Sequence, residues 1–436
     1  MRHVDRRYHA RSRWAQFLAK PVHQVANIVG FMPTSPLPTH FRTATLADTD
    51  RLVEIHMRAF PDARGAAERL RNFEHNAFGP LSSLVVAEQG STLVGHAFLF
   101  DFELGCQGTL LPIAGVASVG IAPEARGKGI GTALMAHLHD LAHARGRVAS
   151  ALFPFREGFY ARLGYGKTSP SLHLECAPTA LSGLRGTCSV RAAVGADRER
   201  IISLHEQQVR SGLGRIRRTE ARWNKLFLNE RRYLLVAERK GELVGYSAVL
   251  FEQEEAHGRV SLRVQDFLAT DSDAERSLLA ALGSQRDQVH RTWLEVPYGS
   301  HLPQTLFDID ALRAGTSDWE HPVGMLTTGA MVRVLDFAAL LELRPLTRDG
   351  TLAFYVANDD ATYSVTQHGA IRSVTKSGGH TSGALKTSAA GASSFLIGGV
   401  SPLALAAAGQ AEGTIAALEH ATELVGLAPF FGCDPF

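Results

Sequence analysis

One stretch of the sequence, residues 119–135, constrains the fold more than any other, because it reads as a strand, a glycine-rich turn and a helix. The strand is rich in β-branched residues and ends at Pro123. The helix that follows has apolar residues at helical spacing and ends before Gly146. These apolar positions are Ile130, Leu134, Leu138 and Leu141. A strand, turn and helix in this order predict an α/β fold.

The turn itself has the composition of an anion-binding loop. Gly127, Gly129 and Gly131 let backbone N–H groups approach a ligand, and the start of the helix adds partial positive charge. Arg126 and Lys128 add two full positive charges. This combination suits a pyrophosphate. Neither the Walker pattern nor the dinucleotide fingerprint fits the spacing of these glycines.

The spacing Arg126-x-x-Gly129-x-Gly131 after an apolar strand resembles the acetyl-CoA loop of the GNAT N-acetyltransferases. An ordinary glycine-rich strand–helix turn is the alternative interpretation. Strand, basic turn and helix together favour the acetyl-CoA loop.

Composition limits the other possibilities. The chain has 436 residues, of which 45% are hydrophobic and 20% charged, and this length predicts about three domains. A formal net charge of +2 does not indicate nucleic-acid binding. The four cysteines are widely separated, and neither they nor the histidines have metal-ligand spacing. The longest apolar stretch, 395–408, is interrupted by glycine and proline. We therefore expect a cytoplasmic protein without a metal site or a membrane span.

The first 38 residues form a basic N-terminal extension. They lack the apolar core of a signal peptide, so we expect a partly helical or disordered segment. An arm that binds nucleic acid or membranes remains an alternative for this extension.

A repeat at long spacing indicates a duplicated domain. The segment from Arg191 to Asp197 echoes the segment from Arg42 to Asp48, and Val-Ala-Glu238 echoes Val-Ala-Glu88. The period is too long for a solenoid. Each copy begins with a strand, a turn and an amphipathic helix, and a hairpin follows.

The second copy lacks the features of the anion-binding turn. Asp271-Ser-Asp-Ala-Glu275 lies where Glu124-Ala-Arg-Gly-Lys128 lies in the first copy. The glycines and the two cations are therefore gone, acidic residues stand in place of the cations, and a pyrophosphate there would meet like charge. We expect the second domain to be GNAT-like but not to bind acetyl-CoA.

The last segment changes character. Strands are expected near residues 352–356, 363–367 and 371–376, followed by an alanine-rich helix and an amphipathic helix at 415–425. Strands with flanking helices predict a small α+β domain.

Three signatures together resemble one family, the enhanced intracellular survival (Eis) acetyltransferases. They are Val119 to Arg126 with the following turn, Phe159-Tyr-Ala-Arg-Leu-Gly-Tyr-Gly166, and the aromatic-rich C-terminal tail. The resemblance implies an α/β (α+β) architecture of tandem GNAT domains, the second degenerate, followed by a sterol-carrier-protein-like domain. The predicted divisions are 1–38 for the extension, 39–177 for the catalytic GNAT domain, 178–328 for the degenerate one and 329–436 for the C-terminal domain.

The resemblance also implies a cosubstrate, an acceptor and an assembly. Acetyl-CoA would donate its acetyl group to an amine of a multi-amine small molecule, such as an aminoglycoside, and the chains would form homohexamers. The residues implied in acetyl-CoA binding are Val119, Gly120, Ile121, Gly127, Lys128, Gly129, Ile130, Gly131, Thr132, Phe155 and Arg156. The general acid falls on Tyr160, and the general base is the carboxylate of Phe436.

The chemistry is compatible with these two roles. An amine attacks the thioester directly, a backbone donor near Ile121 stabilises the oxyanion, and a tyrosine protonates the departing thiolate. Helical spacing predicts that Phe159 and Leu163 make the buried stripe of their helix while Tyr160 borders a cleft. Packing alone is the alternative for Tyr160, and Tyr165 is expected to be structural.

A terminal carboxylate is a weak base unless it is buried. The aromatic tail could bury that of Phe436, although chain ends are usually solvated. Asp434, His137 and His173 are competing candidates for the groups that handle the acceptor.

Two other functions remain open. The first is acetylation of lysine side chains of proteins, and the second is a lipid-binding scaffold without catalysis. The complete turn at Arg126–Gly131 argues against the scaffold, which would not need it.

Overall fold

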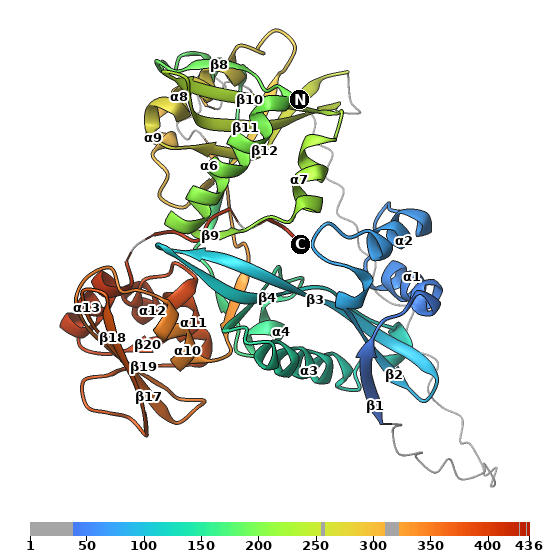
Figure 1. Cartoon of the computed structure of the whole chain (residues 1–436), viewed down its shortest axis with the longest axis vertical. Helices are drawn as coiled ribbons and strands as arrows, with labels where there is room; N and C mark the ends of the chain where they lie inside the picture. Colours follow the sequence, from blue (N-terminus) through green and yellow to red (C-terminus); the bar gives the residue numbers. More distant parts are fainter. Residues whose placement is uncertain (1–37, 254–257, 310–321, 427, 433) are drawn as a thin grey trace, which may run out of the picture. The chain divides into compact units, whose positions relative to one another are not determined.

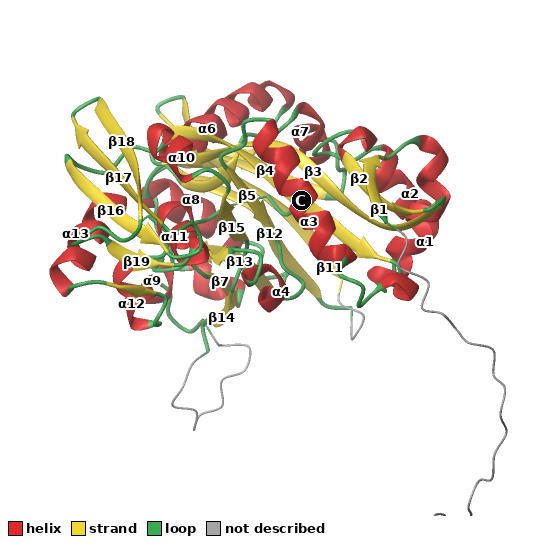
Figure 2. Cartoon of the chain, turned by 90° about the horizontal axis from the view of Figure 1, so that it is seen from below, coloured by secondary structure: helices red, strands yellow, loops and turns green. Residues whose placement is uncertain are grey.

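The computed structural model describes residues 38–253, 258–309, 322–426, 428–432 and 434–436. Within these residues the strands form three β-sheets with helices beside them, which confirms the predicted mixed α/β fold (Figures 1 and 2). The predicted basic extension lies outside the described residues, apart from Pro38.

The first sheet has the strand order β1-β2-β3-β4-β5-β15-β6, and β9 pairs with β3. Its strands are β1 (Thr39–Thr43), β2 (Leu84–Gln89), β3 (Thr92–Cys106), β4 (Thr109–Ile121), β5 (Ala149–Leu152), β6 (Gly166–Lys167), β9 (Leu213–Ile216) and β15 (Met331–Val334). The helices in this part of the chain are α1 (Thr49–Ala59), α2 (Ala66–Glu74), α3 (Ile130–Ala144), α4 (Glu157–Ala161) and α5 (Pro178–Ser182).

The central strand β4 is paired unequally on its two sides. On one side it follows β3 along its whole length, with a bulge where Ser118 adopts a positive φ of 51°. On the other side it runs parallel to β5 only over Ile113–Val116. Beyond Val116 no described strand pairs with that edge, so β4 and β5 separate there and leave backbone groups of β4 available.

Helix α3 follows β4 as the sequence predicts and packs against β3 and β4 (Figure 1). Its apolar positions Leu134 and Leu138 are fully buried, and Gly146 takes a positive φ of 70° just after the helix. Glycine tolerates this backbone conformation, whereas a residue with a Cβ would be strained. The apolar face fixes α3, and therefore also fixes the direction of the turn before it.

The second sheet has the order β14-β7-β13-β12-β11-β10-β8. Its strands are β7 (Ser171–Cys176), β8 (Ser189–Ala192), β10 (Arg232–Arg239), β11 (Glu242–Gln253), β12 (Val260–Ala269), β13 (Arg291–Pro297) and β14 (Gly324–Thr327). The helices in this part are α6 (Arg198–Ser211), α7 (Glu220–Phe227), α8 (Ser272–Gly283) and α9 (Leu302–Thr305).

The two copies of the sequence repeat also share the same ion pairs. Arg42 binds Asp48 at 2.8 Å and Glu88 at 3.2 Å. The corresponding Arg191 binds Asp197 at 2.6 Å and Glu238 at 2.9 Å. In both copies the aspartate also accepts a backbone N–H three residues earlier, so the same ion-pair cluster ties the first strand, the turn and the hairpin together.

Three strands pair outside the predicted sequence divisions. β7 precedes residue 177 but lies in the second sheet, between β14 and β13. β9 pairs with β3 of the first sheet, and β15, after residue 328, lies between β5 and β6. These pairings are between residues distant in sequence, which hydrophobic pattern does not specify.

The third sheet, with the order β18-β17-β16-β19-β20, contains the strands expected in the last segment. Its elements are β16 (Gly350–Val356), β17 (Ala361–His368), β18 (Ile371–Gly378), β19 (Leu385–Thr387), β20 (Ala411–Glu412), α10 (Phe337–Leu343), α11 (Ala389–Ile397), α12 (Pro402–Ala407) and α13 (Ile415–Val425). This is an α+β arrangement, and its likeness to sterol carrier proteins stays a prediction.

Buried histidines are a further feature of the core. His205 of α6 is fully buried with its ring edge-on to Trp223, and neither ring nitrogen has a hydrogen-bond partner among the described residues. Burial lowers the pKa of His205 from 6.5 to about 3, helped by the positive charge of Arg218 and opposed by Asp266. His205 is therefore neutral in the folded protein at neutral pH.

This burial predicts a pH dependence of stability. Between the lowered pKa and about 6.5, the unfolded chain binds a proton at His205 that the folded chain does not, so stability falls as the pH falls. The slope is about 1.4 kcal/mol per pH unit for one such proton. We expect the thermal midpoint of His205→Leu to depend less on pH between 7 and 5 than that of the parent. The exposed His368 supplies a control in His368→Gln, and equal slopes in all three proteins would contradict the prediction.

Candidate active site

The turn between β4 and α3 has an open backbone. Gly127 and Gly129 take positive φ values of 76° and 77°, and a Cβ at either position would meet no atom within 4 Å. Gly129 is the N-cap of α3, and no side chain caps the helix. The first N–H groups of α3 therefore have no partner within the helix and face open space. Free N–H groups at the N-terminus of a helix are a common binding site for anions.

A cavity of about 880 Å³ lies at this turn. Its walls come from the end of β4, the turn, the first residues of α3, the end of α1 and α4 with the segment before it. The predicted residues that line it are Val119, Ile121, Gly127, Gly129, Ile130, Gly131, Thr132, Phe155 and Arg156.

Two predicted residues do not line the cavity. Gly120 faces the other side of β4, where a Cβ would lie 2.8 Å from the Nε2 atom of buried His96, because side chains alternate along a strand. Lys128 is exposed on the turn. The sequence predicts the turn as a whole, but it does not show which of the predicted residues face the cavity and which face away from it.

Residues without a motif complete the cavity. Ala59 and Phe60, at the end of α1, and Arg162, after α4, also line it. Arg126, Arg156 and Arg162 are the arginines of the lining, and Glu157 is its carboxylate. Glu157 is bound to Lys167 at 2.5 Å, so the arginines outweigh it. Only the chain fold brings α1 to this place, and no sequence signal marks Ala59 or Phe60.

The equivalent position in the second domain is filled by the chain itself. Asp271 caps α8 and accepts the N–H groups of Asp273 and Ala274 at 3.0 and 2.9 Å. Arg239 donates two further hydrogen bonds to the same carboxylate, at 2.8 and 2.9 Å. A carboxylate therefore occupies the helix N-terminus that remains open in α3, in agreement with the predicted loss of the anion site.

Tyr160 lies behind the cavity wall. It is 2% exposed, and its ring is 5.8 Å from that of Phe155 and 5.0 Å from that of Phe159. Phe159 lines the cavity, so the predicted orientation of this helix is wrong: Tyr160 is the buried residue and Phe159 faces the opening. The helix has five residues, too few for periodicity to specify which side is covered.

Burial has a chemical consequence for Tyr160. It raises the pKa of the phenol above its usual value of 10.0, so the hydroxyl stays protonated at neutral pH. Among the described residues none forms a hydrogen bond with this hydroxyl. Tyr165 differs, because its hydroxyl bonds Ser150 at 2.7 Å and His139 at 3.0 Å, which fits the structural role expected for it.

The C-terminal tail crosses to the first sheet and is anchored along its length. The Phe430 N–H bonds Ser169 Oγ at 2.7 Å and the Phe431 N–H bonds the Leu213 carbonyl at 2.8 Å. The ring of Phe436 then packs on Phe102, with centroids 4.9 Å apart, and on Phe153, at 5.5 Å. The last residue therefore lies at a defined place beside the first sheet.

The competing candidates have other roles. The carboxylate of Asp434 is buried and accepts hydrogen bonds from Arg218 at 2.7 Å and Arg222 at 2.8 Å. His137 stacks on Phe41 with ring centroids 4.8 Å apart. His173 lies on β7 of the second sheet and faces Glu295 at 3.8 Å.

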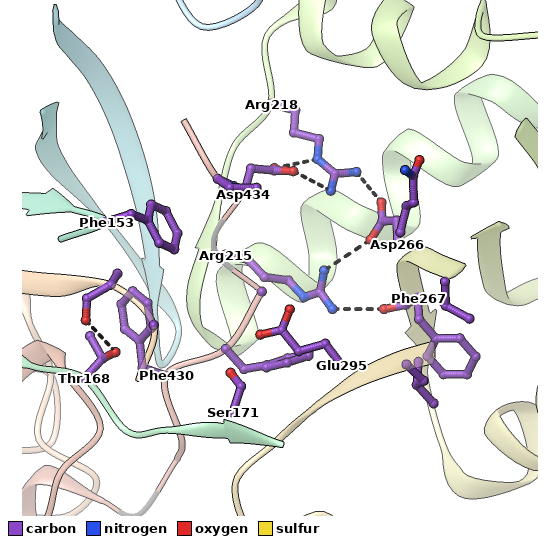
Figure 3. Close-up of a pocket in the computed structure, with 18 of the residues that line it drawn as sticks. Phe153, Thr168, Ser171, Arg215, Arg218, Asp266, Phe267, Glu295, Phe430 and Asp434 are labelled. Atoms are coloured by element: carbon purple, nitrogen blue, oxygen red, sulfur yellow. Dashed lines mark hydrogen bonds and ion pairs between the residues drawn. The ribbon is translucent and has the colours of Figure 1, made fainter. Parts of the chain in front are cut away.

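A second cavity, of about 390 Å³, lies where the tail passes β12 and the start of β7 (Figure 3). In its wall, Arg218 is joined to Asp434 of the tail and to Asp266 of β12, and Arg215 approaches Asp266 at 3.8 Å. The adjacent Phe153 and Pro435 also line this cavity. It therefore borders the residues that hold Phe436.

Among the described residues, no three or more His, Cys, Asp or Glu side chains are arranged so that they could hold a metal ion. None of the helices in the described ranges combines the length and apolar character that a bilayer span requires.

The narrow space at Gly131 gives a test of the first cavity. A Cβ at Gly131 would lie 3.7 Å from Ile121 and 3.7 Å from Phe159, so the larger side chain of Gly131→Val extends into the cavity. We expect acetyl-CoA, the ligand predicted for this turn, to bind about tenfold more weakly or worse by isothermal titration. The thermal midpoint should change by no more than about 2 °C, since valine is no worse than glycine in a helix.

Gly183→Val is the matched control, because a Cβ at Gly183 meets nothing within 4 Å and the residue lies outside both cavities. Unchanged acetyl-CoA affinity in Gly131→Val would show that this cavity is not the binding site.

Comparison with known proteins agrees with this geometry. Residues 40–168 and residues 214–334 match two separate families, each described as an acetyltransferase (GNAT) domain. The N-acetyltransferase Eis of Mycobacterium bovis is 38% identical over 88 residues, which are 20% of this chain and 22% of the relative. An Eis of Mycobacterium tuberculosis matches to the same extent. The match thus spans about a fifth of the length of these curated relatives.

Solved structures share the fold over most of the chain. A GCN5-related N-acetyltransferase from Anabaena variabilis has a TM-score of 0.76 at 20% identity, over 90% of this chain and 98% of that one. Eis1 from Mycobacterium abscessus has a TM-score of 0.73 at 21% identity, over 92% of this chain and 100% of that one. The chain therefore contains two acetyltransferase (GNAT) domains. It is similar in sequence to Eis over a fifth of its length, and it shares its fold with Eis1.

Proposed function

We propose that the protein transfers the acetyl group of acetyl-CoA to a primary amine. The observation that carries this proposal is the open N-terminus of α3, which is preserved in the first GNAT domain and filled by Asp271 in the second. A protein that served only as a scaffold would have no need of this difference.

Acetyl-CoA fits the first cavity by its chemistry. The N–H groups of Ile130, Gly131 and Thr132 would hold the pyrophosphate, and Arg126 and Arg156 would add charge. Arg126 also donates to the carbonyl of Ile121 at 3.2 Å, so it links the turn to the end of β4. The cosubstrate supplies a thioester, whose carbonyl carbon is the electrophile.

The edge of β4 would stabilise the negative charge on the reacting carbonyl. Beyond Val116 this edge is not paired with β5, so a backbone N–H near Ile121 can donate a hydrogen bond to an oxygen outside the sheet. A preorganised backbone donor stabilises the transition state without reorganising during the reaction.

Tyr160 would be the general acid and the carboxylate of Phe436 the general base. The amine nitrogen forms the new C–N bond while the C–S bond breaks, the thiolate takes the proton of Tyr160, and the carboxylate accepts a proton from the amine. That proton then restores Tyr160, so the products are the amide and the free thiol. Burial keeps the hydroxyl of Tyr160 protonated at neutral pH, so its proton is present, while the raised pKa also makes it a weaker acid. The anchored ring of Phe436 supports a fixed position for the carboxylate.

We also propose a class of acceptor and an assembly. The resemblance to Eis favours a multi-amine small molecule, such as an aminoglycoside, and a homohexamer, and acetylation of protein lysines is the second candidate. A screen of aminoglycosides, polyamines and lysine peptides, followed by free-thiol release and product mass, decides between them. Isothermal titration with acetyl-CoA tests the proposal itself, and absence of binding would refute it.

The two tyrosines provide a matched test of the general acid. Tyr160→Phe keeps the buried ring and removes only the hydroxyl, so we expect kcat to fall roughly 100-fold or more while acetyl-CoA affinity is kept. Tyr165→Phe removes two hydrogen bonds of the core, so it should lower the free energy of unfolding by about 1–2 kcal/mol and leave kcat nearly unchanged. Equal effects of the two substitutions on kcat would remove Tyr160 from the mechanism.

The general base is tested by moving the carboxylate. Two residues, Gly-Ser, added after Phe436 leave its ring in place but carry the carboxylate away. We expect kcat to fall by about tenfold or more, as for loss of a general base, without a change in acetyl-CoA affinity. The same dipeptide added before Met1 is the control. Full turnover of the C-terminally extended chain would contradict the assignment.

A further inference from the structure

The second cavity has a positively charged lining to which the proposed function assigns no role. Its lining contains five cationic side chains and three carboxylates. The cationic residues are Arg215, Arg218, Arg222, Lys225 and Arg232, and the acidic ones are Asp266, Glu295 and Asp434. The lining as a whole is therefore positive.

Two of the three carboxylates, Asp434 and Asp266, are already engaged by arginines, and the third, Glu295, is exposed and lies 3.8 Å from His173. Asp434 is bound by Arg218 at 2.7 Å and by Arg222 at 2.8 Å. Asp266 is bound by Arg218 at 2.5 Å, accepts the hydroxyl of Tyr246 at 2.9 Å and lies 3.8 Å from Arg215. These acids balance the arginines deep in the cavity and have little capacity left for other cations.

Lys225 and Arg232 remain without an acidic partner. Among the residues that the structure describes, no carboxylate lies within ion-pair distance of either side chain. Arg232 is held in place by bonds to Gln265 and to the Lys225 carbonyl, which use its Nε and Nη1 atoms and leave Nη2 available. Partial burial, and then the like charge of Arg222, lower the pKa of both Lys225 and Arg232. An anion that entered the cavity would relieve this repulsion.

The second cavity lies next to residues of the proposed acetyl-transfer site. Phe153 lines it and packs on Phe436, and Pro435, the neighbour of Phe436, lines it as well. Phe155, two residues beyond Phe153, lines the first cavity. Segment 153–155 therefore contributes to the linings of both cavities. A molecule held by Lys225 and Arg232 would lie in the second cavity, on the side of this segment where Phe436 packs.

We propose that this cavity binds a carboxylate or phosphate group carried by the amine acceptor, with Lys225 and Arg232 as its ligands. The inference rests on the proposed acetyl transfer to a primary amine. In place of the multi-amine acceptor that the resemblance favours, it assigns an amine that also carries an anionic group. A polycation would meet like charge at this lining, whereas an anionic group completes its ion pairs.

The test compares small amines of similar size that differ in their second group. Thiol release is measured with the full chain and acetyl-CoA for O-phosphoethanolamine, β-alanine, ethanolamine and 1,3-diaminopropane. We expect KM for one or both anionic amines to be about tenfold lower than for ethanolamine, and 1,3-diaminopropane to be the poorest acceptor. The phosphate and carboxylate arms show which anion the cavity prefers.

A substitution at Lys225 tests the binding of the anionic amines in a protein that still folds. Lys225 is exposed and its ammonium group has no hydrogen-bond partner among the described residues, so Lys225→Glu should fold normally. We expect this variant to raise KM for the anionic amines by about tenfold or more. Its acetyl-CoA affinity and its KM for ethanolamine should stay unchanged. Lys386→Glu, on β19 of the third sheet, is the control.

The outcomes distinguish the two proposals. A protein that binds acetyl-CoA and acetylates ethanolamine or 1,3-diaminopropane at least as well as the anionic amines overturns this inference alone. Unchanged kinetics of Lys225→Glu overturn it as well. Absence of acetyl-CoA binding refutes the proposed function, and the acceptor site with it. Titration with inorganic phosphate, in the parent and in Lys225→Glu, is a second readout: binding that the variant weakens supports the site, and no binding to the parent counts against a phosphate ligand.

Discussion

Arg218 is the residue on which the arrangement of the second cavity and of the C-terminal tail depends. Its guanidinium joins Asp434 of the C-terminal tail to Asp266 of β12, and all three side chains are almost completely buried. Each carboxylate keeps a lowered pKa because of this partner. Removing one partner of such a group leaves a buried charge without compensation, which typically costs about 3–5 kcal/mol. The ion pairs therefore hold the tail against the second domain, and the position of Phe436 follows from them.

The two copies of the duplicated domain share one ion-pair cluster and differ at the start of one helix. Both copies keep the cluster of arginine, aspartate and glutamate that ties the first strand to the hairpin, so both keep the fold. They differ at the start of the helix after the fourth strand, where Gly129 leaves α3 open and Asp271 closes α8. The second domain instead contributes α7 and β12, whose charged side chains line the second cavity beside the tail. The second domain thus has a filled helix N-terminus and supplies cationic side chains to the second cavity.

Local sequence was sufficient for much of the first cavity. The turn at Gly127 and Gly129 could be predicted because positive φ values demand glycine, and α3 because its apolar residues recur at helical spacing. Orientation was harder. Tyr160 and Phe159 exchange the predicted roles of cleft and core, because a helix of five residues has no repeated pattern to show its covered side. Gly120 was grouped with its neighbours, although strand alternation turns it toward His96.

The sequence by itself determined the α/β class, the duplication, the open turn of the first copy and the acidic replacement in the second. Each of these depends on residues that are close in the chain, where spacing and backbone preference act directly. Only the tertiary structure decided that β7, β9 and β15 pair outside their sequence neighbours, that Ala59 and Phe60 complete the first cavity, and that Asp434 binds Arg218. Contacts of this kind join residues far apart in the chain, and their partners are chosen by shape, burial and charge balance in the folded protein, which no local pattern records.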